Sequence, residues 1–361
     1  MDNHTSRLPV VDALKAIASQ LIVLHHLALY GPMSDIAYDL VPGLIEWLAN
    51  HARIAVQVFL VVGGFLSARS LAALGSHAIG LPLLLVWKRY CRLAIPFMMA
   101  MLLAVACAAV ARALLPLDST PAAPGLLQLI AHLLLIQNLL DFEALSAGVW
   151  YVAIDFQLYS LMVALLWLAG IGGTAGHRRL AIVLVSGLGI ASLLYFNRIT
   201  AWDDWGLYFF GAYALGALAF WASESKLPLV WLALTTAGVV AALLLDFRSR
   251  IVVALFAAVL LGLTLQTRRP LHPAAARQLS FLGDISYSVF LVHYPVSLVF
   301  NALFGRLAPE SPGLNVLGLL LAWGACIPAG TLFHRQVELP AMAWLSRHST
   351  LRLAGKANTA R

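Results

Sequence analysis

The number of membrane crossings in this chain depends on residues 126–140, Leu-Leu-Gln-Leu-Ile-Ala-His-Leu-Leu-Leu-Ile-Gln-Asn-Leu-Leu. The run is strongly apolar but has only fifteen residues, whereas a helix needs about 20 residues to cross the hydrocarbon core of a bilayer. We therefore expect this segment to form a short helix that is re-entrant or interfacial and does not span the membrane.

Ten other apolar runs approach the length of a membrane span. They lie at about 9–30, 53–73, 93–114, 149–170, 180–197, 206–223, 227–246, 250–267, 279–304 and 313–334. Of the 361 residues, 61% are hydrophobic and 11% are charged, against roughly 25% charged residues in soluble domains. These features predict an all-α integral membrane protein, with a single transmembrane domain at 1–345 and a basic cytoplasmic tail at 346–361.

The distribution of basic residues supports ten spans. The basic segments 88–92, 178–179, 268–277 and 347–361 should face the cytoplasm, and they share one side only if 126–140 does not cross. With both termini cytoplasmic, 16 of the 23 Lys and Arg residues lie inside, six lie outside and Lys15 lies within the first span. The net charge of +7 then reflects anchoring among membrane lipids and not nucleic-acid binding. We expect a multi-pass protein of the inner (cytoplasmic) membrane.

The first apolar run carries ionisable side chains at membrane depth, where such groups are costly and often functional. Eleven positions separate Lys15 from His26, which is almost three helical turns. Lys15, Ser19 and His26 therefore share one face, with Asp12 on the same side, while His25 points about 100° away. Two readings stay open: an inner-end ion pair with a packed histidine, or a stripe that lines a functional cavity.

Several motifs resemble those of the membrane-bound acyltransferase 3 family. Residues 11–18, Val-Asp-Ala-Leu-Lys-Ala-Ile-Ala, resemble its opening signature, in which a basic residue precedes a histidine by ten intervening residues. Counting from Lys15 gives His26, and Ala13 replaces the usual Gly. Further matches follow in the family's order, at 58–66 with Gly63 in place of Ser, 89–92, 150–159 with Asp155 in place of Glu, 282–288, 291–295 and 338–340.

This resemblance covers about residues 7–345 and implies an acyltransferase. Such an enzyme would carry an acyl group, expected to be acetyl, from cytoplasmic acyl-CoA to a hydroxyl of a sugar-type envelope acceptor at the outer side of the membrane. Its partners would be acyl-CoA and a glycan or glycolipid, and it would hold no permanent cofactor. The chain resembles the stand-alone form of the family, without an appended extracytoplasmic domain.

Within this resemblance, His26 and Asp155 are the expected catalytic residues. Histidine suits a general base because its pKa lies near the working pH. By residue count, His26 lies roughly 6 Å and Asp155 roughly 9 Å from the outer ends of their helices. We hypothesise that Asp155 orients His26 or stabilises its protonated form, as carboxylates do in catalytic triads.

The donor and acceptor sites are assigned to the two ends of the spans. Arg89 and Arg92 either anchor the inner end of their helix or, as the resemblance implies, bind the phosphates of CoA. Lys15 and Ser19 would then line the path of the pantetheine arm. Near the outer face, the residues that could contact the acceptor are Arg53, Gln57 and Trp150, although Trp150 equally suits an interfacial anchor.

His293 and Tyr287 in the ninth run, together with Asp12, are candidate supporting residues. Simple packing of His293 with a satisfied hydrogen bond is an alternative. A zinc site from His26, His293 and Asp155 is not expected, because the spacing of metal ligands is missing. Two rival functions stay open: a polytopic transporter, and an acyltransferase whose acceptor is a lipid or a small molecule.

Overall fold

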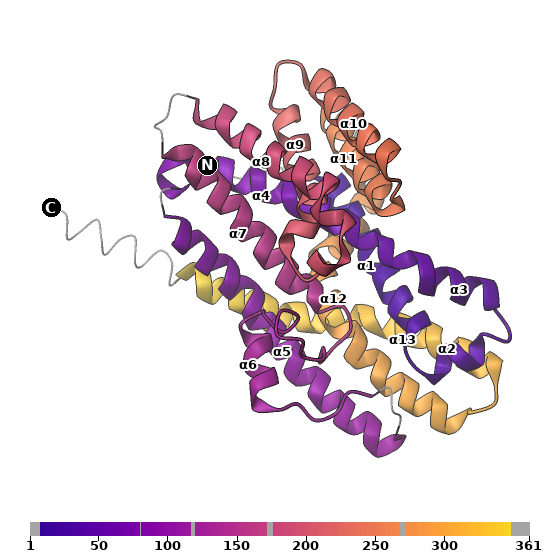
Figure 1. Cartoon of the computed structure of the whole chain (residues 1–361). Helices are drawn as coiled ribbons and strands as arrows, with labels where there is room; N and C mark the ends of the chain where they lie inside the picture. The colour runs from indigo at the N-terminus through magenta and orange to yellow at the C-terminus, as the bar shows by residue number, and fades with distance from the viewer. Residues whose placement is uncertain (1–7, 80, 117–119, 172–175, 268–271, 348–361) are drawn as a thin grey trace. The chain divides into compact units, whose positions relative to one another are not determined.

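The computed structural model describes residues 8–79, 81–116, 120–171, 176–267 and 272–347, and these residues form helices and connecting turns with no β-strand (Figure 1). The helices are α1 (Pro9–Leu29), α2 (Pro32–Ala37), α3 (Pro42–His51), η1 (Ala52–Ala55), α4 (Val56–Ile79), α5 (Pro82–Leu114), α6 (Leu126–Leu133), α7 (Trp150–Gly170), α8 (His177–Leu194), η2 (Phe196–Arg198), η3 (Thr200–Trp202), α9 (Gly206–Ser223), α10 (Pro228–Leu245), α11 (Ser249–Thr267), α12 (Pro273–Leu307), α13 (Pro312–Phe333) and the π-helical η4 (His334–Glu338).

Ten helical segments of the described chain are long and apolar enough to cross a membrane. They correspond one to one with the ten apolar runs, so the all-α fold with ten spans is confirmed. α6 has eight residues and is not among them. The cytoplasmic placement of both termini remains a prediction, and residues 348–361 of the expected basic tail lie outside the described residues.

Some helices begin well before their apolar runs. α5 starts at Pro82, eleven positions before the expected 93, and its 33 residues measure about 50 Å at 1.5 Å per residue, longer than a hydrocarbon core of about 30 Å. α12 likewise has 35 residues and starts at Pro273. Hydropathy reports only the part of a helix that lies in lipid. The helical hydrogen bonds of α5 and α12 extend further toward the N-terminus, through polar residues, and each helix begins at a proline, a residue that suits the first turn.

α6 ends at Leu133, although the apolar run continues to 140. Leu135 adopts a left-handed conformation with φ 58°. The amide of Ile136 donates to the carbonyl of Ala131 at 3.0 Å, and that of Leu135 donates to His132 at 3.1 Å. This is the Schellman pattern, which ends helices, so residues 134–149 form irregular turns instead of a continued helix.

The chain divides into two compact units. The first is drawn from Met1–Ile22, His51–Val86 and Ala153–Ser286, and the second from Val23–Asn50, Trp87–Val152 and Tyr287–Arg361. The divisions fall inside α1, α3, α5, α7 and α12, so each of these helices contributes residues to both units, α3 only its last residue to the first.

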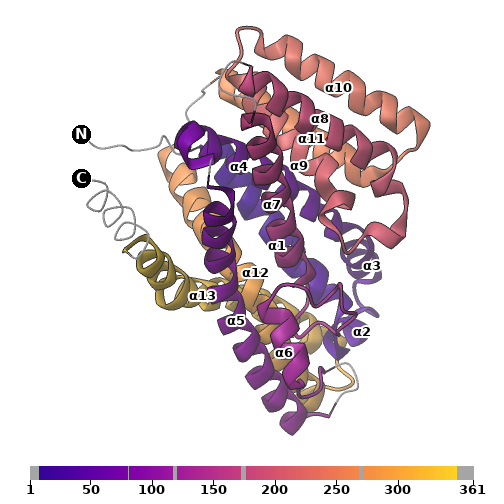
Figure 2. The same cartoon turned by 60° about the vertical axis from the view of Figure 1, so that its left-hand side comes forward.

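The first unit is built around the pair α4 and α9, with α8, α10 and α11 beside them (Figures 1 and 2). Two glycines let the backbones of the central pair touch. A Cβ on Gly64 would lie 1.8 Å from the carbonyl oxygen of Tyr213, and one on Gly216 would lie 1.8 Å from that of Val61. Small residues at such crossings are typical of helix pairs in membranes.

The second unit packs α5, α6, α2, α13 and residues 287–307 of α12. Asn301 of α12 fixes the turn that follows α1: its Oδ1 accepts from the amide of Met33 at 3.1 Å and its Nδ2 donates to the carbonyl of Tyr30 at 3.2 Å. Gly31 has φ +100°, and a Cβ there would lie 2.4 Å from the Asn301 side chain. The end of α1 is therefore held at a defined place against α12.

Candidate functional site

Two histidines of the second unit form a direct hydrogen bond. His26, in the last turn of α1, places Nδ1 2.6 Å from Nε2 of His293 in α12. Their rings are nearly parallel, at 11° with centroids 4.9 Å apart. Both residues are buried, with exposed fractions of 7% and 1%.

The partners of the two rings define their tautomers. Nδ1 of His293 lies 2.6 Å from the backbone carbonyl of Phe290, which can only accept, so this nitrogen carries the proton. In a neutral ring Nε2 of His293 is then an acceptor, and Nδ1 of His26 must donate to it. The lone pair of neutral His26 therefore resides on Nε2, the atom that could take a proton from a substrate.

A glycine and a tyrosine pack against His26, and a second tyrosine packs against the first. Gly148, with φ +78°, packs so closely that a Cβ there would lie 3.0 Å from Cε1 of His26. The rings of His26 and Tyr30 have centroids 5.7 Å apart, and Tyr30 meets Tyr294 edge to face at 5.6 Å. The imidazole is thus enclosed by α1, α12 and the segment before α7.

The adjacent His25 faces a different element. Its Nδ1 lies 3.0 Å from the backbone carbonyl of Leu48 in α3. The two neighbouring histidines therefore have different partners, one in α3 and the other in α12. A role in chemistry suits His26, whereas His25 joins α1 to α3.

The sequence matches a known protein family. The sequence model described as an acyltransferase domain, acyltransferase 3, matches residues 8–333. The chain belongs to the membrane acyltransferase 3 family. No curated protein and no solved structure shows significant similarity to the chain. The protein is therefore a multi-pass membrane acyltransferase, and the expected family membership and enzyme class are both confirmed.

The expected donor-binding arginines of this acyltransferase also belong to the second unit. Arg89 is half-buried and Arg92 is exposed on α5. Tyr287 of α12 donates from its hydroxyl to the carbonyl of Leu93, 3.2 Å away, so it fixes α12 beside the turn that carries Arg92. Tyr90 of the same turn donates to the carbonyl of Leu133 in α6 at 2.8 Å.

The inner end of α1 lies in the first unit. Asp12 is buried, its Oδ1 lies 3.9 Å from Nζ of Lys15, and its Oδ2 accepts from the hydroxyl of Ser280 at 3.2 Å. A Cβ on Gly283 would lie 2.9 Å from Cα of Asp12. Ser19 is buried and donates to the carbonyl of Ala16 at 2.9 Å. Asp12 therefore joins α1 to α12.

Asp155 is a buried residue of α7 in the first unit. A Cβ on Gly63 would lie 3.6 Å from its Oδ1 and 3.3 Å from the ring of Tyr213. The hydroxyl of Tyr213 donates to Ser67 at 2.7 Å. Gly63, where the family usually has Ser, therefore lets the Asp155 carboxylate and the Tyr213 ring pack directly against the backbone of α4.

The three candidate acceptor residues differ in exposure. Arg53 is exposed in η1 and Gln57 is buried in the first turn of α4. Gln57 and Arg53 belong to the first unit. Trp150 is half-buried at the start of α7 and belongs to the second unit. Trp150 meets Tyr151 edge to face at 6.3 Å.

Sequence reasoning did not find the backbone groups of this site. The carbonyl of Phe290 and the close packing of Gly148 have no motif of their own, although a glycine directly before a helix is a general signal for an unusual φ. Sequence reasoning named Asp155 as the group that orients His26 and gave His293 only a supporting role, whereas the structure shows a hydrogen bond between His26 and His293, 267 positions away in the chain.

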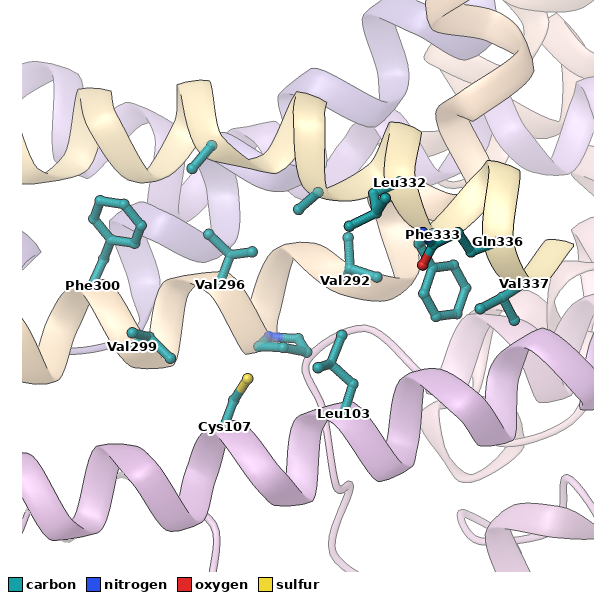
Figure 3. A pocket seen from close by; sticks show the side chains of 13 residues that line it. Leu103, Cys107, Val292, Val296, Val299, Phe300, Leu332, Phe333, Gln336 and Val337 are labelled. Carbon is teal, nitrogen blue, oxygen red and sulfur yellow. The ribbon is translucent and has the colours of Figure 1, made fainter.

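An apolar cavity of about 400 Å³ lies between α5, α12 and α13 of the second unit (Figure 3). Val292 and Val296, which flank His293 in α12, point into it together with Leu103 and Cys107 of α5. Its lining is almost entirely hydrocarbon, which suits a lipid chain more than polar chemistry. Among the residues that the structure describes, no group of three or more His, Cys, Asp or Glu side chains is placed to hold a metal ion.

Proposed function

We propose that this enzyme transfers an acyl group, acetyl first of all, from cytoplasmic acyl-CoA to a hydroxyl of a sugar-type envelope acceptor at the outer side of the inner membrane. The observation that carries this proposal is the hydrogen-bond relay from the Phe290 carbonyl through His293 to His26. The relay supports a lone pair on Nε2 of His26, and we therefore propose this atom as the general base.

In the proposed reaction, the hydroxyl oxygen of the acceptor attacks the carbonyl carbon of the thioester. Nε2 of His26 takes the hydroxyl proton as the new C–O bond forms. The C–S bond then breaks, and the proton passes from Nε2 to the departing thiolate to give free CoA. No proton is gained or lost overall, so a single imidazole nitrogen can serve both half-steps.

His293 acts in this proposal as a positioning residue. Its Nε2 accepts the Nδ1 proton of His26 and keeps that ring in one tautomer, as the aspartate does in a catalytic triad. When His26 becomes an imidazolium, the same hydrogen bond becomes charge-assisted and therefore stronger. Asp155 is proposed as a second group that orients or stabilises protonated His26, as the sequence motifs suggested.

Arg89 and Arg92 are proposed to bind the phosphates of CoA, since guanidinium groups match phosphate oxygens well. Support comes from the exposure of Arg92 and from the fixed position of the turn that carries both arginines, which Tyr90 and Tyr287 hold. Lys15 and Ser19 are proposed to line the path of the pantetheine arm. Arg53, Gln57 and Trp150 remain the proposed contacts of the acceptor.

The deciding experiment is turnover of acetyl-CoA by the purified protein in detergent, with His26→Ala compared with His25→Ala. We expect His26→Ala to abolish turnover and His25→Ala to retain it, provided that both variants keep the melting temperature of the wild type. Equal activity of the wild type and His26→Ala would refute the catalytic assignment.

The identity of the acceptor needs a separate measurement. Mass spectrometry of envelope fractions from a deletion strain should show loss of an acetyl group from a glycan. Loss from a lipid or a small metabolite instead would favour the alternative acceptor class, with the same chemistry at His26.

A further inference from the structure

Two consecutive amide side chains before α7, those of the buried Gln137 and the half-buried Asn138, carry buried polar atoms without hydrogen-bond partners among the described residues. Gln137 has an exposed fraction of 0%. Neither its Oε1 nor its Nε2 has a partner among the described residues, and the same holds for Oδ1 of Asn138. Buried polar atoms in native proteins are nearly always hydrogen-bonded, so such a cluster needs a ligand, a water molecule or another explanation.

The backbone holds these amides in a defined turn. Asp141 has φ 55°, and its backbone amide donates to the backbone carbonyl of Asn138 at 3.1 Å. The backbone amide of Phe142 donates to the backbone carbonyl of Gln137 at 2.9 Å. This repeats the Schellman pattern seen at Leu135. Leu135 and Asp141 are the two non-glycine residues with positive φ in the described chain, and each costs roughly 1–2 kcal/mol.

Side chains of α6 fix the rest of the segment. Nδ1 of His132 donates to the carbonyl of Gln128 at 2.8 Å, and its Nε2 accepts from the amide of Leu145 at 3.2 Å. Nε2 of Gln128 donates to the carbonyl of Glu143 at 2.8 Å. The turn that carries Gln137 is therefore part of a preorganised segment.

The same segment ends against the proposed base. Ala147 is buried in a cluster with Tyr294 and Leu298 of α12, and the next residue, Gly148, packs on the imidazole of His26. Residues 134–149 thus connect the unpartnered amides with the reaction centre inside one unit.

We propose that Gln137 and Asn138 bind hydroxyl groups of the acceptor, an inference that rests on the proposed function. A primary amide offers both donors and an acceptor, and both sides of the Gln137 amide lack a protein partner. A hydroxyl also donates and accepts, so neighbouring hydroxyls of a sugar satisfy both sides at once. A thioester carbonyl or a phosphate oxygen only accepts and would leave Oε1 without a donor.

The test separates the acceptor from the donor. Gln137→Leu is compared with Gln336→Leu, which makes the same substitution at an exposed position of η4. Two rates are measured for each purified variant. The first is hydrolysis of acetyl-CoA without acceptor. The second is transfer of radiolabelled acetyl to an added envelope fraction, prepared from a strain that lacks the protein.

We expect Gln137→Leu to lower incorporation about tenfold or more, the effect of one lost hydrogen bond that leaves its partner unpaired. Hydrolysis should stay within about twofold of the wild type, which also shows that the variant is folded. Gln137→Asn, which keeps the amide, should recover part of the loss at high acceptor concentration.

Two results would overturn the proposal: unchanged incorporation, as expected if the amides bind only water, or an equal fall of both rates. If the wild type turns over acetyl-CoA in a manner that depends on His26 while Gln137→Leu is unaffected, only this inference fails. If the wild type shows no turnover, the proposed function fails and the acceptor site fails with it.

Discussion

Nδ1 of His26 and Nε2 of His293 lie 2.6 Å apart, and a backbone carbonyl fixes the far side of His293. In the proposed mechanism, a neutral imidazole thus takes the place that a carboxylate holds in a catalytic triad. An imidazole accepts the proton of its neighbour without carrying a negative charge, which is costly at membrane depth.

Substitution of His293 should impair catalysis without loss of the fold. We expect His293→Ala to reduce turnover of acetyl-CoA by about 100-fold, within the range for general-base catalysis, because His26 loses its fixed tautomer. His293→Gln should be less damaging, since the side-chain oxygen of glutamine can accept the Nδ1 proton. A merely structural role would lower the melting temperature and leave the pH profile of the residual activity unchanged.

Asp155→Asn removes a negative charge and keeps the size of the side chain. If Asp155 stabilises protonated His26, turnover should fall at least tenfold, which corresponds to about 1.4 kcal/mol. Asp203→Asn, in the exposed turn before α9, is the matched control and should be neutral. A loss of less than tenfold in Asp155→Asn would remove this residue from the catalytic group.

The donor role of the arginine pair predicts a binding defect. Arg89→Ala should raise the apparent KM for acetyl-CoA about tenfold, because one charge-assisted hydrogen bond to phosphate is lost, and should change kcat less. Arg179→Ala, an exposed arginine of α8, serves as the control for loss of one positive charge. An unchanged KM in Arg89→Ala would show that the pair is an anchor.

Gly148 should not tolerate a side chain. Gly148→Ala combines positive φ with a Cβ 3.0 Å from the His26 ring, and we expect a loss of stability of about 1–2 kcal/mol together with a marked loss of turnover. Gly125→Ala is the control, because a Cβ there meets no atom within 4 Å. Comparable activity of the two variants would show that Gly148 does not fix the position of His26.

The turn that follows α6 should respond to acid. Burial lowers the pKa of His132, with a smaller opposing effect of the hydrogen bond to Gln128, so the folded state favours the neutral ring. The stabilisation is present above the unfolded pKa of about 6.5 and decreases as the pH falls below it, because a protonated Nε2 cannot accept from Leu145. The protection factor of the Leu145 amide, which compares its exchange rate with that of an unprotected amide at the same pH, should therefore fall below about pH 6.5, and His132→Gln should reduce this dependence.

The sequence predicted the number of spans because the thickness of the bilayer sets the length of each apolar run, and basic loops mark the cytoplasmic side. It could not predict the ends of α5 and α12, since helical hydrogen bonding continues through polar residues where hydropathy is silent. The end of α6 was also missed, because Leu135 takes a conformation that sequence normally assigns to glycine.

For the site, helical periodicity separated His26 from His25, and the structure gives the two rings different partners, in α12 and α3. The pairing with His293 was beyond the sequence, because it depends on how α1 packs against α12 in three dimensions. Gln137 and Asn138 carried no signal either: two polar residues in an apolar run become informative only when their burial is known.

The hydrogen-bond relay also has a consequence for inhibitor design. Three of the four ring nitrogens of the histidine pair are engaged in the contacts to each other and to Phe290. An electrophilic inhibitor that reaches the pair should therefore alkylate His26 at Nε2 in preference to the other three ring nitrogens. A short reactive group carried on a sugar scaffold would combine this selectivity with affinity for the acceptor side, and the mass and position of its single adduct would identify the nucleophilic atom directly.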